Sequence, residues 1–170
     1  MFTSDIIKSI SKYQSKSESV LPRAGRGVLP SASEGTMIER SLVVIKPDGV
    51  KRSLTGNIIR RFEQTGLKIV GMKMVWVDKG FARKHYKAHA GKSFFKDLVA
   101  FLSEGPVVAF AVEGVHAVDN VRKLVGPTSP SDAPPGTIRG DFAHLSMKYA
   151  SQTGSGGKNI IHASGSLQEA

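Results

Sequence analysis

The sequence predicts an α+β fold of the ferredoxin-like type, a βαββαβ sandwich with one antiparallel sheet and helices on one face. Short apolar, β-branched runs alternate with helical periodicity in the order strand, helix, strand, helices, strand, helix, strand. Hydrophobic residues make up 40% of the 170 residues, which is enough for a buried core. The longest apolar run, residues 107–112, is far shorter than the roughly 20 residues of a membrane-spanning helix, so we expect no membrane partner.

The first strand and helix have clear boundary signals. Residues 41–45 form a short run rich in β-branched side chains, as expected of a buried strand. Lys46-Pro47-Asp48-Gly49 ends this strand with a predicted turn. Thr55 can cap the next helix, which ends at Gly66. The apolar stripe of that helix consists of Ile58, Ile59 and Phe62.

The middle of the chain continues the alternation. We predict strands at residues 67–77 and 107–112, and helices at residues 80–87, 94–102 and 116–124. A loop rich in Pro and Gly follows at residues 126–140. Two further strand-like stretches, residues 142–149 and 159–162, are separated by a segment with the composition of a flexible linker, residues 151–157.

The first 36 residues differ from the rest. They are rich in Ser and Gly and contain two prolines. We expect residues 1–36 to be a disordered N-terminal extension or a targeting segment, with Met37 as a possible true start of the domain over residues 37–170. Lys+Arg 24 against Asp+Glu 14 gives a net charge of +10, of which residues 1–36 hold +2. The positive excess therefore belongs to the folded body and indicates an anionic partner.

Several kinds of site are excluded because essential residues are missing. Without cysteine there is no disulfide, thiolate zinc site or cysteine nucleophile. Neither Gly91-Lys92-Ser93 nor Gly157-Lys158 follows the glycine that a P-loop requires, and the dinucleotide-binding glycine pattern fails as well. Any phosphate must therefore be bound by side chains.

Two further motifs have simpler explanations. His85 and His89 have the spacing of zinc ligands, but the glutamate and a third ligand are missing, so we predict no metal site and interpret them as a solvated pair on a surface helix. Residues 79–82 begin like an RNA-binding RNP1 motif, but they lie in a predicted helix. Nucleic acid is therefore an improbable partner.

A dispersed set of polar residues could hold a polyphosphate. Arginine offers planar, bidentate donors to phosphate oxygens, and lysine offers a point charge. Each residue alone has an ordinary structural explanation as a surface cation or a satisfied histidine, and spacing does not decide between the two. The set consists of Lys46, Arg122, Arg139 and His162, with Thr128 and Tyr86.

Four longer motifs surround these residues, namely VIKPDGV at 44–50, GPVVA at 105–109, PGTIRGDF at 135–142 and NIIHAS at 159–164. In this order they resemble the nucleoside diphosphate kinase family, and the resemblance runs from about Ile38 to the C-terminus. It implies transfer of the γ-phosphate of ATP or another nucleoside triphosphate to a nucleoside diphosphate. The family route is ping-pong through a phosphohistidine, with Mg²⁺ bound through the nucleotide phosphates.

The resemblance also implies roles for individual residues. His162 would be the catalytic nucleophile, and Tyr86 would help to position its ring. Lys46 would reach the γ-phosphate and the ribose, and Asn159 would contact the sugar. Phe94 would stack on the base, which suits any base because each has a π-face. The phosphates would be held by Arg122, Thr128 and Arg139.

Three departures from the family pattern concern the C-terminal part. About ten extra residues lie around residues 149–157, where we expect a flexible surface loop. The family's aspartate three residues after the histidine is Gly165 here. The family's C-terminal helix, with a glutamate that orients the histidine, would begin beyond Ala170, so we expect a C-terminally truncated domain with weak activity or stability.

Two alternatives to the kinase remain at this stage. One is a catalytically weak or silent paralogue that binds nucleotide and acts as an interaction module. The other is a nucleic-acid-binding module that uses the positive surface. The resemblance further implies a homo-oligomer, hexamer or tetramer. The default compartment is the cytoplasm, with mitochondria as the alternative if residues 1–36 are a targeting segment.

Overall fold

The computed structural model describes residues 38–154 and 157–170. The strands are β1 (Ile38–Ile45), β2 (Lys68–Trp76), β3 (Pro106–Val115) and β4 (Ile161–Ala163). The α-helices are α2 (Pro47–Lys51), α3 (Thr55–Gln64), α4 (Lys79–His85), α5 (Phe95–Leu102), α6 (Ala117–Val125), α7 (Ile138–Phe142) and α8 (Met147–Thr153). Two short 3₁₀ helices are η1 (Lys87–His89) and η2 (Pro130–Asp132).

The four strands form one antiparallel sheet in the order β2-β3-β1-β4. This confirms the predicted α+β class and the βαββαβ plan, in which β3 and β1 are central and β2 and β4 lie at the edges. The connection between β2 and β3 is not a hairpin, because α4, η1 and α5 are inserted there. The short edge strand β4 carries His162.

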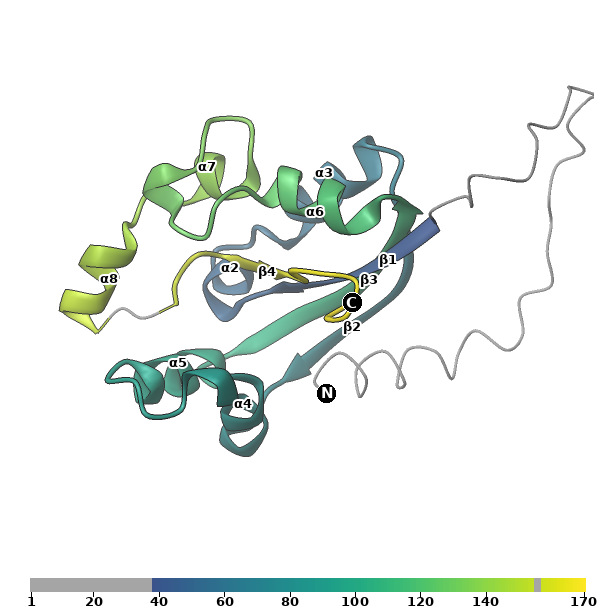
Figure 1. Ribbon diagram of the computed structural model, residues 1–170. Helices are drawn as coiled ribbons and strands as arrows, with labels where there is room; N and C mark the ends of the chain where they lie inside the picture. The colour runs from purple at the N-terminus through teal and green to yellow at the C-terminus, as the bar shows by residue number, and fades with distance from the viewer. Residues whose placement is uncertain (1–37, 155–156) are drawn as a thin grey trace, which may run out of the picture.

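The central strands β1 and β3 bury side chains on both faces of the sheet, because side chains alternate along a strand and helices cover each face. Val43 and Ile45 of β1 pack in a core with α3 and α6, whereas Leu42 and Val44 pack in a second core with α4 and α5. Figure 1 shows α3 and α6 on one side of the sheet and α4 and α5 on the other. The expectation that helices cover one face only is therefore wrong, since the inserted helices cover the second.

Helical periodicity explains the packing of α3 and α6. Ile58 and Phe62 of α3 are fully buried, and the Phe62 ring meets the edge of the Phe110 ring of β3 with the centroids 5.4 Å apart. α6 buries the stripe Ala117, Val118, Val121 and Val125. The predicted cap of α3 is corrected by one residue, because Leu54 occupies the cap position and Thr55 is the first helical residue.

Three local predictions are overturned. The predicted turn at residues 46–49 is the start of α2, which begins with Pro47 at a position where its missing N–H costs nothing. The predicted strand at residues 142–149 is wrong, because Ser146 accepts a hydrogen bond from the Tyr149 N–H and starts α8. Residues 151–153 of the supposed linker belong to that helix, so the extra segment is partly helical. The predictions for residues 1–36 lie outside the described residues.

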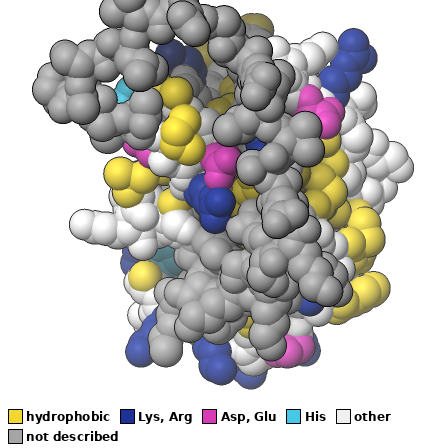
Figure 2. Space-filling model, turned by 90° about the vertical axis from the view of Figure 1, so that its right-hand side faces the viewer, with side chains coloured by type: hydrophobic (Ala, Val, Ile, Leu, Met, Phe, Trp, Pro, Cys, Tyr) yellow, Lys and Arg dark blue, Asp and Glu magenta, His cyan; other side chains and the backbone are white. Residues whose placement is uncertain are grey.

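Edge strand β2 carries an exposed apolar surface. Met72, Met74 and Trp76 are exposed, although they lie on one strand of the sheet. Figure 2 shows hydrophobic side chains at the surface on this side of the molecule. Within residues 38–154 and 157–170, no helix has the length and apolar character needed to cross a bilayer.

Candidate active site

A cavity of about 320 Å³ opens at the β4 edge of the sheet, lined by residues of α6, α7 and the C-terminal segment. It brings together five of the six predicted substrate-binding residues and the predicted nucleophile. The lining residues are Lys46, Arg122, Val125, Gly126, Thr128, Arg139, Asn159, His162, Ala163, Gly165 and Glu169. Three cationic side chains and one imidazole in so small a space make the cavity a site for an anion.

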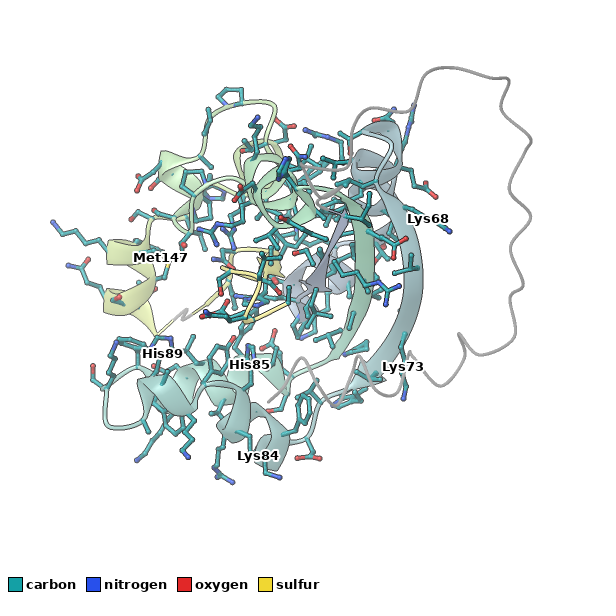
Figure 3. All side chains as sticks on the ribbon, turned by 45° about the vertical axis from the view of Figure 1, so that its right-hand side comes forward. Lys68, Lys73, Lys84, His85, His89 and Met147 are labelled. Atoms are coloured by element: carbon teal, nitrogen blue, oxygen red, sulfur yellow. The ribbon has the colours of Figure 1, made fainter. Side chains whose placement is uncertain are left out.

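The strand register determines where the His162 ring points. His162 pairs with Val44, and paired residues share a face of the sheet. Val44 packs in the core with α4 and α5, so the imidazole lies on that side, and the His85 ring of α4 meets its edge with the centroids 5.5 Å apart. In Figure 3, His85 lies at the side of α4 nearest the C-terminal segment, whereas Lys84 points away from it. The interpretation of His85 as a solvated surface residue is therefore wrong.

Both imidazoles are held in their neutral form. Burial lowers the pKa of His162 to about 3, with the neighbouring Lys46, His85, Arg139 and Arg122 acting in the same direction. Burial also lowers the pKa of His85 to about 4, with Lys46 and His89 acting in the same direction and Glu169 opposing. A neutral ring with a free lone pair is the nucleophilic form of histidine.

We expect the folded protein to lose stability as the pH falls from 7 to 5. In this range the unfolded chain takes up protons on His85 and His162 near their ordinary pKa of about 6.5, whereas the folded chain does not. The free energy of unfolding should drop by on the order of 1–2 kcal/mol per imidazole. Urea denaturation at each pH measures the slope. His85→Gln should flatten it, His144→Gln at an exposed position should not, and a curve for the wild type that is flat between pH 7 and 5 would contradict the burial of the rings.

Lys46 is almost completely buried, at 8% exposure, between the end of β1 and the start of α2. Its Nζ donates to Asn159 Oδ1 at 2.7 Å and to the Gly157 carbonyl at 3.0 Å. Burial and the charge of Arg139 lower the pKa of Lys46 to about 8, and Asp48 opposes them. The ammonium therefore has one N–H left for a ligand, since lysine has three donors.

Arg139 is held almost entirely by backbone carbonyls. Nη1 donates to the carbonyls of Gly126 and Pro127, Nη2 donates to Ile161, and Nε donates to Asn159. Burial and the nearby charge of Arg122 lower the pKa of Arg139 to about 10. Four of its five N–H groups therefore donate to backbone carbonyls, and one on Nη2 is left for a ligand.

The other three predicted binding residues come from three segments. Arg122 lies on α6, Thr128 follows that helix, and Asn159 precedes β4. The Asn159 amide donates from Nδ2 to the Thr128 carbonyl at 2.9 Å while its oxygen accepts from Lys46. This side chain is therefore fixed from both ends, and it joins the loop after α6 to the segment that leads into His162.

Phe94 and Tyr86 do not line the cavity. They belong to a row of rings in which neighbouring centroids lie 4.6–6.3 Å apart, and the row runs Phe94, His89, Tyr86, His85 and His162. Phe94 is half-buried just before α5, and the Lys92 ammonium lies 5.7 Å above its ring. The row connects Phe94 to the cavity along the α4 side.

Sequence analysis missed Glu169. Its carboxylate accepts a hydrogen bond from the Gly165 N–H at 2.6 Å. A Cβ atom on Gly165 would lie 2.9 Å from the same oxygen and 3.6 Å from Arg122 Nη1. Glu169 is thus the acidic residue that lines the cavity, and no motif in the sequence pointed to it.

Fold and site together define a class: an α+β protein with a cavity in which a neutral imidazole lies among fixed cations. The family model described as nucleoside diphosphate kinase matches residues 39–170. The chain therefore belongs to the nucleoside diphosphate kinase family, and it is an enzyme of that kind.

Relatives and solved structures agree with this placement. The nucleoside diphosphate kinase of Pyrococcus furiosus is 53% identical over 133 residues, 78% of this chain and 78% of the relative. That of Sulfurisphaera tokodaii is 51% identical over 133 residues, 78% of this chain and 84% of the relative. A transition-state mimic of the Borrelia burgdorferi enzyme with bound vanadate and ADP has a TM-score of 0.74 at 43% identity, covering 79% of this chain and 83% of that one. The Halobacterium salinarum enzyme in complex with CDP has a TM-score of 0.68 at 43% identity, covering 76% and 82%.

Proposed function

We propose that this chain transfers the γ-phosphate of ATP or another nucleoside triphosphate to a nucleoside diphosphate through a phosphohistidine at His162. One observation carries the proposal: the imidazole held neutral by burial lies in the same cavity as Lys46, Arg122 and Arg139. A neutral nucleophile next to fixed positive charge suits an attack on an anionic phosphate.

The reaction has two balanced steps. In the first, the lone pair of a ring nitrogen of His162 forms a bond to the γ-phosphorus, and the bond from this phosphorus to the β,γ-bridging oxygen breaks. The electron pair leaves with the nucleoside diphosphate. In the second, a terminal oxygen of a new nucleoside diphosphate attacks the same phosphorus, and the P–N bond returns its electrons to the ring. One site can therefore serve donor and acceptor in turn.

The remaining residues would bind and orient the nucleotide. Lys46 has one free N–H, which could reach the γ-phosphate or the ribose, and Arg139 has one free N–H for the phosphates. Arg122 and Thr128 would complete the phosphate site, and Asn159 would contact the sugar. Phe94 would stack on the base at the end of the row of rings. The relatives whose structures hold ADP and CDP support a nucleotide in such a site.

Mg²⁺ is expected to arrive with the nucleotide phosphates. Among the described residues, no three His, Cys, Asp or Glu side chains gather as a metal cage. The cavity does offer the Glu169 carboxylate, and Mg²⁺ is commonly held by one carboxylate together with substrate phosphates and waters. The donor set therefore fits a phosphate-bound ion, which would neutralise charge on the transferred group.

Labelling with γ-tagged ATP in the presence of Mg²⁺ tests the proposal. The wild-type chain should take up label in a bond that is cleaved by acid and resists alkali, as a phosphohistidine does. Addition of GDP without ATP should release the label as GTP. Protein that binds nucleotide but takes up no label would instead support the silent paralogue, an alternative that the glycine at position 165 favours, because a side chain there would lie near Glu169 and Arg122.

A homo-oligomer, hexamer or tetramer, is part of the proposal. The exposed Met72, Met74 and Trp76 on edge strand β2 support it, because a monomer seldom leaves such an edge uncovered. We further propose the cytoplasm as its compartment, or the mitochondria if residues 1–36 direct it there. Nucleic acid is not part of the proposed function.

A further inference from the structure

Ile160, two residues before the nucleophile, has an unusual backbone conformation. Its φ angle is +71°, in the left-handed region that β-branched residues rarely adopt, and its side chain is fully buried. Such a conformation is unfavourable for a β-branched residue and persists only where the surroundings impose it. Because the ladder between β1 and β4 starts at Ile161, the Ile160 peptide groups need partners outside the sheet.

A single turn of chain supplies both partners. The Lys46 N–H donates to the Ile160 carbonyl at 2.8 Å, and the Ile160 N–H donates to Asp48 Oδ2 at 3.0 Å. Gly49 allows this close approach, because a Cβ there would lie 2.8 Å from Ile45 Cγ2 and 3.2 Å from the Ile160 carbonyl oxygen. The start of α2 thus holds Ile160 through its N–H and its C=O.

The buried position of Asp48 is unfavourable for an ionised carboxylate. Burial raises its pKa, and Lys46 and the nearby backbone N–H groups of Ile160, Gly49 and Asp48 only partly oppose that. The side chain does not line the cavity, so it touches no reacting atom. Its hydrogen bond to a residue 112 positions away connects it to the segment that carries His162.

We propose that Asp48 is a positioning residue: its hydrogen bond holds Ile160 in the left-handed conformation and so sets the direction in which the His162 ring leaves β4. The inference rests on the proposed phosphohistidine route. Misplacement of the ring would leave nucleotide binding intact and slow the in-line attack, for which a shift of about 1 Å can cost on the order of 100-fold.

Two phosphoryl donors test the inference. ATP must be attacked in the geometry fixed by the cavity, whereas phosphoramidate is small and can approach the ring from several directions. Asp48→Ala should label from ATP 10- to 100-fold more slowly, as roughly expected for lost alignment, with nucleotide KM within about threefold. Labelling from phosphoramidate should change by less than about threefold, because the imidazole itself is unaltered.

Variants at matched sites separate positioning from general stability. Asp48→Asn keeps an oxygen that can accept from Ile160 and should restore most of the ATP rate. Glu39→Ala removes another carboxylate that accepts a backbone N–H, that of Val118 in α6, and should leave the ATP rate unchanged. Where Asp48→Ala fails to fold, Asp48→Ser, whose shorter side chain cannot reach Ile160, takes its place.

The outcomes distinguish this inference from the proposed function. A wild-type chain that takes up no label from either donor would refute the phosphohistidine route itself. If the wild type takes up label and the Asp48→Ala variant is labelled by ATP at the same rate, only the positioning role is refuted. Equal losses with both donors would also refute it, because they would show damage to the ring environment as a whole.

Discussion

Replacement of His162 by alanine should abolish labelling by ATP and lower the phosphotransfer rate by at least about 10⁴-fold, the scale of loss when a covalent nucleophile is removed. Among the described residues that line the cavity, His162 has the only imidazole; the other nitrogen-bearing side chains are lysine, arginine and asparagine, and the Glu169 carboxylate accepts the Gly165 N–H. The affinity for nucleotide should change by less than about threefold, because the cationic groups that would bind phosphate remain.

The measurement combines single-turnover labelling with nucleotide titration by calorimetry. His144→Ala, at an exposed position, is the matched control and should label like the wild type. His85→Ala is a second control. The His85 ring lies next to the His162 ring and is the imidazole that could be mistaken for the labelled one. If His162→Ala still takes up label, and this label is as acid-labile as that on the wild type, the nucleophile is another residue and the assignment is contradicted.

Arg139→Lys should be the most damaging substitution that conserves charge. One ammonium cannot reach the four carbonyls that the guanidinium fork now serves, so two or three of them lose their partner in a buried site. We expect the free energy of unfolding to fall by roughly 2–4 kcal/mol, since an unsatisfied buried polar group costs about 1–3 kcal/mol. The phosphotransfer rate should drop at least about 100-fold, because Asn159 and Ile161 flank the turn that leads to His162.

Urea denaturation and single-turnover labelling measure the two effects. Arg40→Lys is the matched control, because the Arg40–Glu113 pair is exposed and such pairs contribute little to stability. A variant with slow phosphotransfer but the stability of the wild type would mean that Arg139 acts through the phosphates alone. That result would contradict the framework role that its four carbonyl contacts indicate.

Local pattern was enough for most of the regular elements. Strands β1 and β3 are β-branched runs, and α3 and α6 have apolar stripes of helical spacing, so the sequence predicted them within a few residues. Residues 142–149 were predicted wrongly because their aromatic content favours a strand, while the cap at Ser146 favours a helix. In the structure the Ser146 hydroxyl caps α8, and these residues take no part in the sheet.

The sequence by itself also determined the family and most of the polar set around His162, because Lys46, Arg139, Asn159 and His162 lie in contiguous motifs. What the tertiary structure decided is how these groups act. Burial at the sheet edge makes the His162 ring neutral, and contacts across more than 100 residues join Lys46 and Asp48 to Asn159 and Ile160. Such effects depend on desolvation and on distances between remote segments, and neither quantity is encoded in any local stretch of the chain.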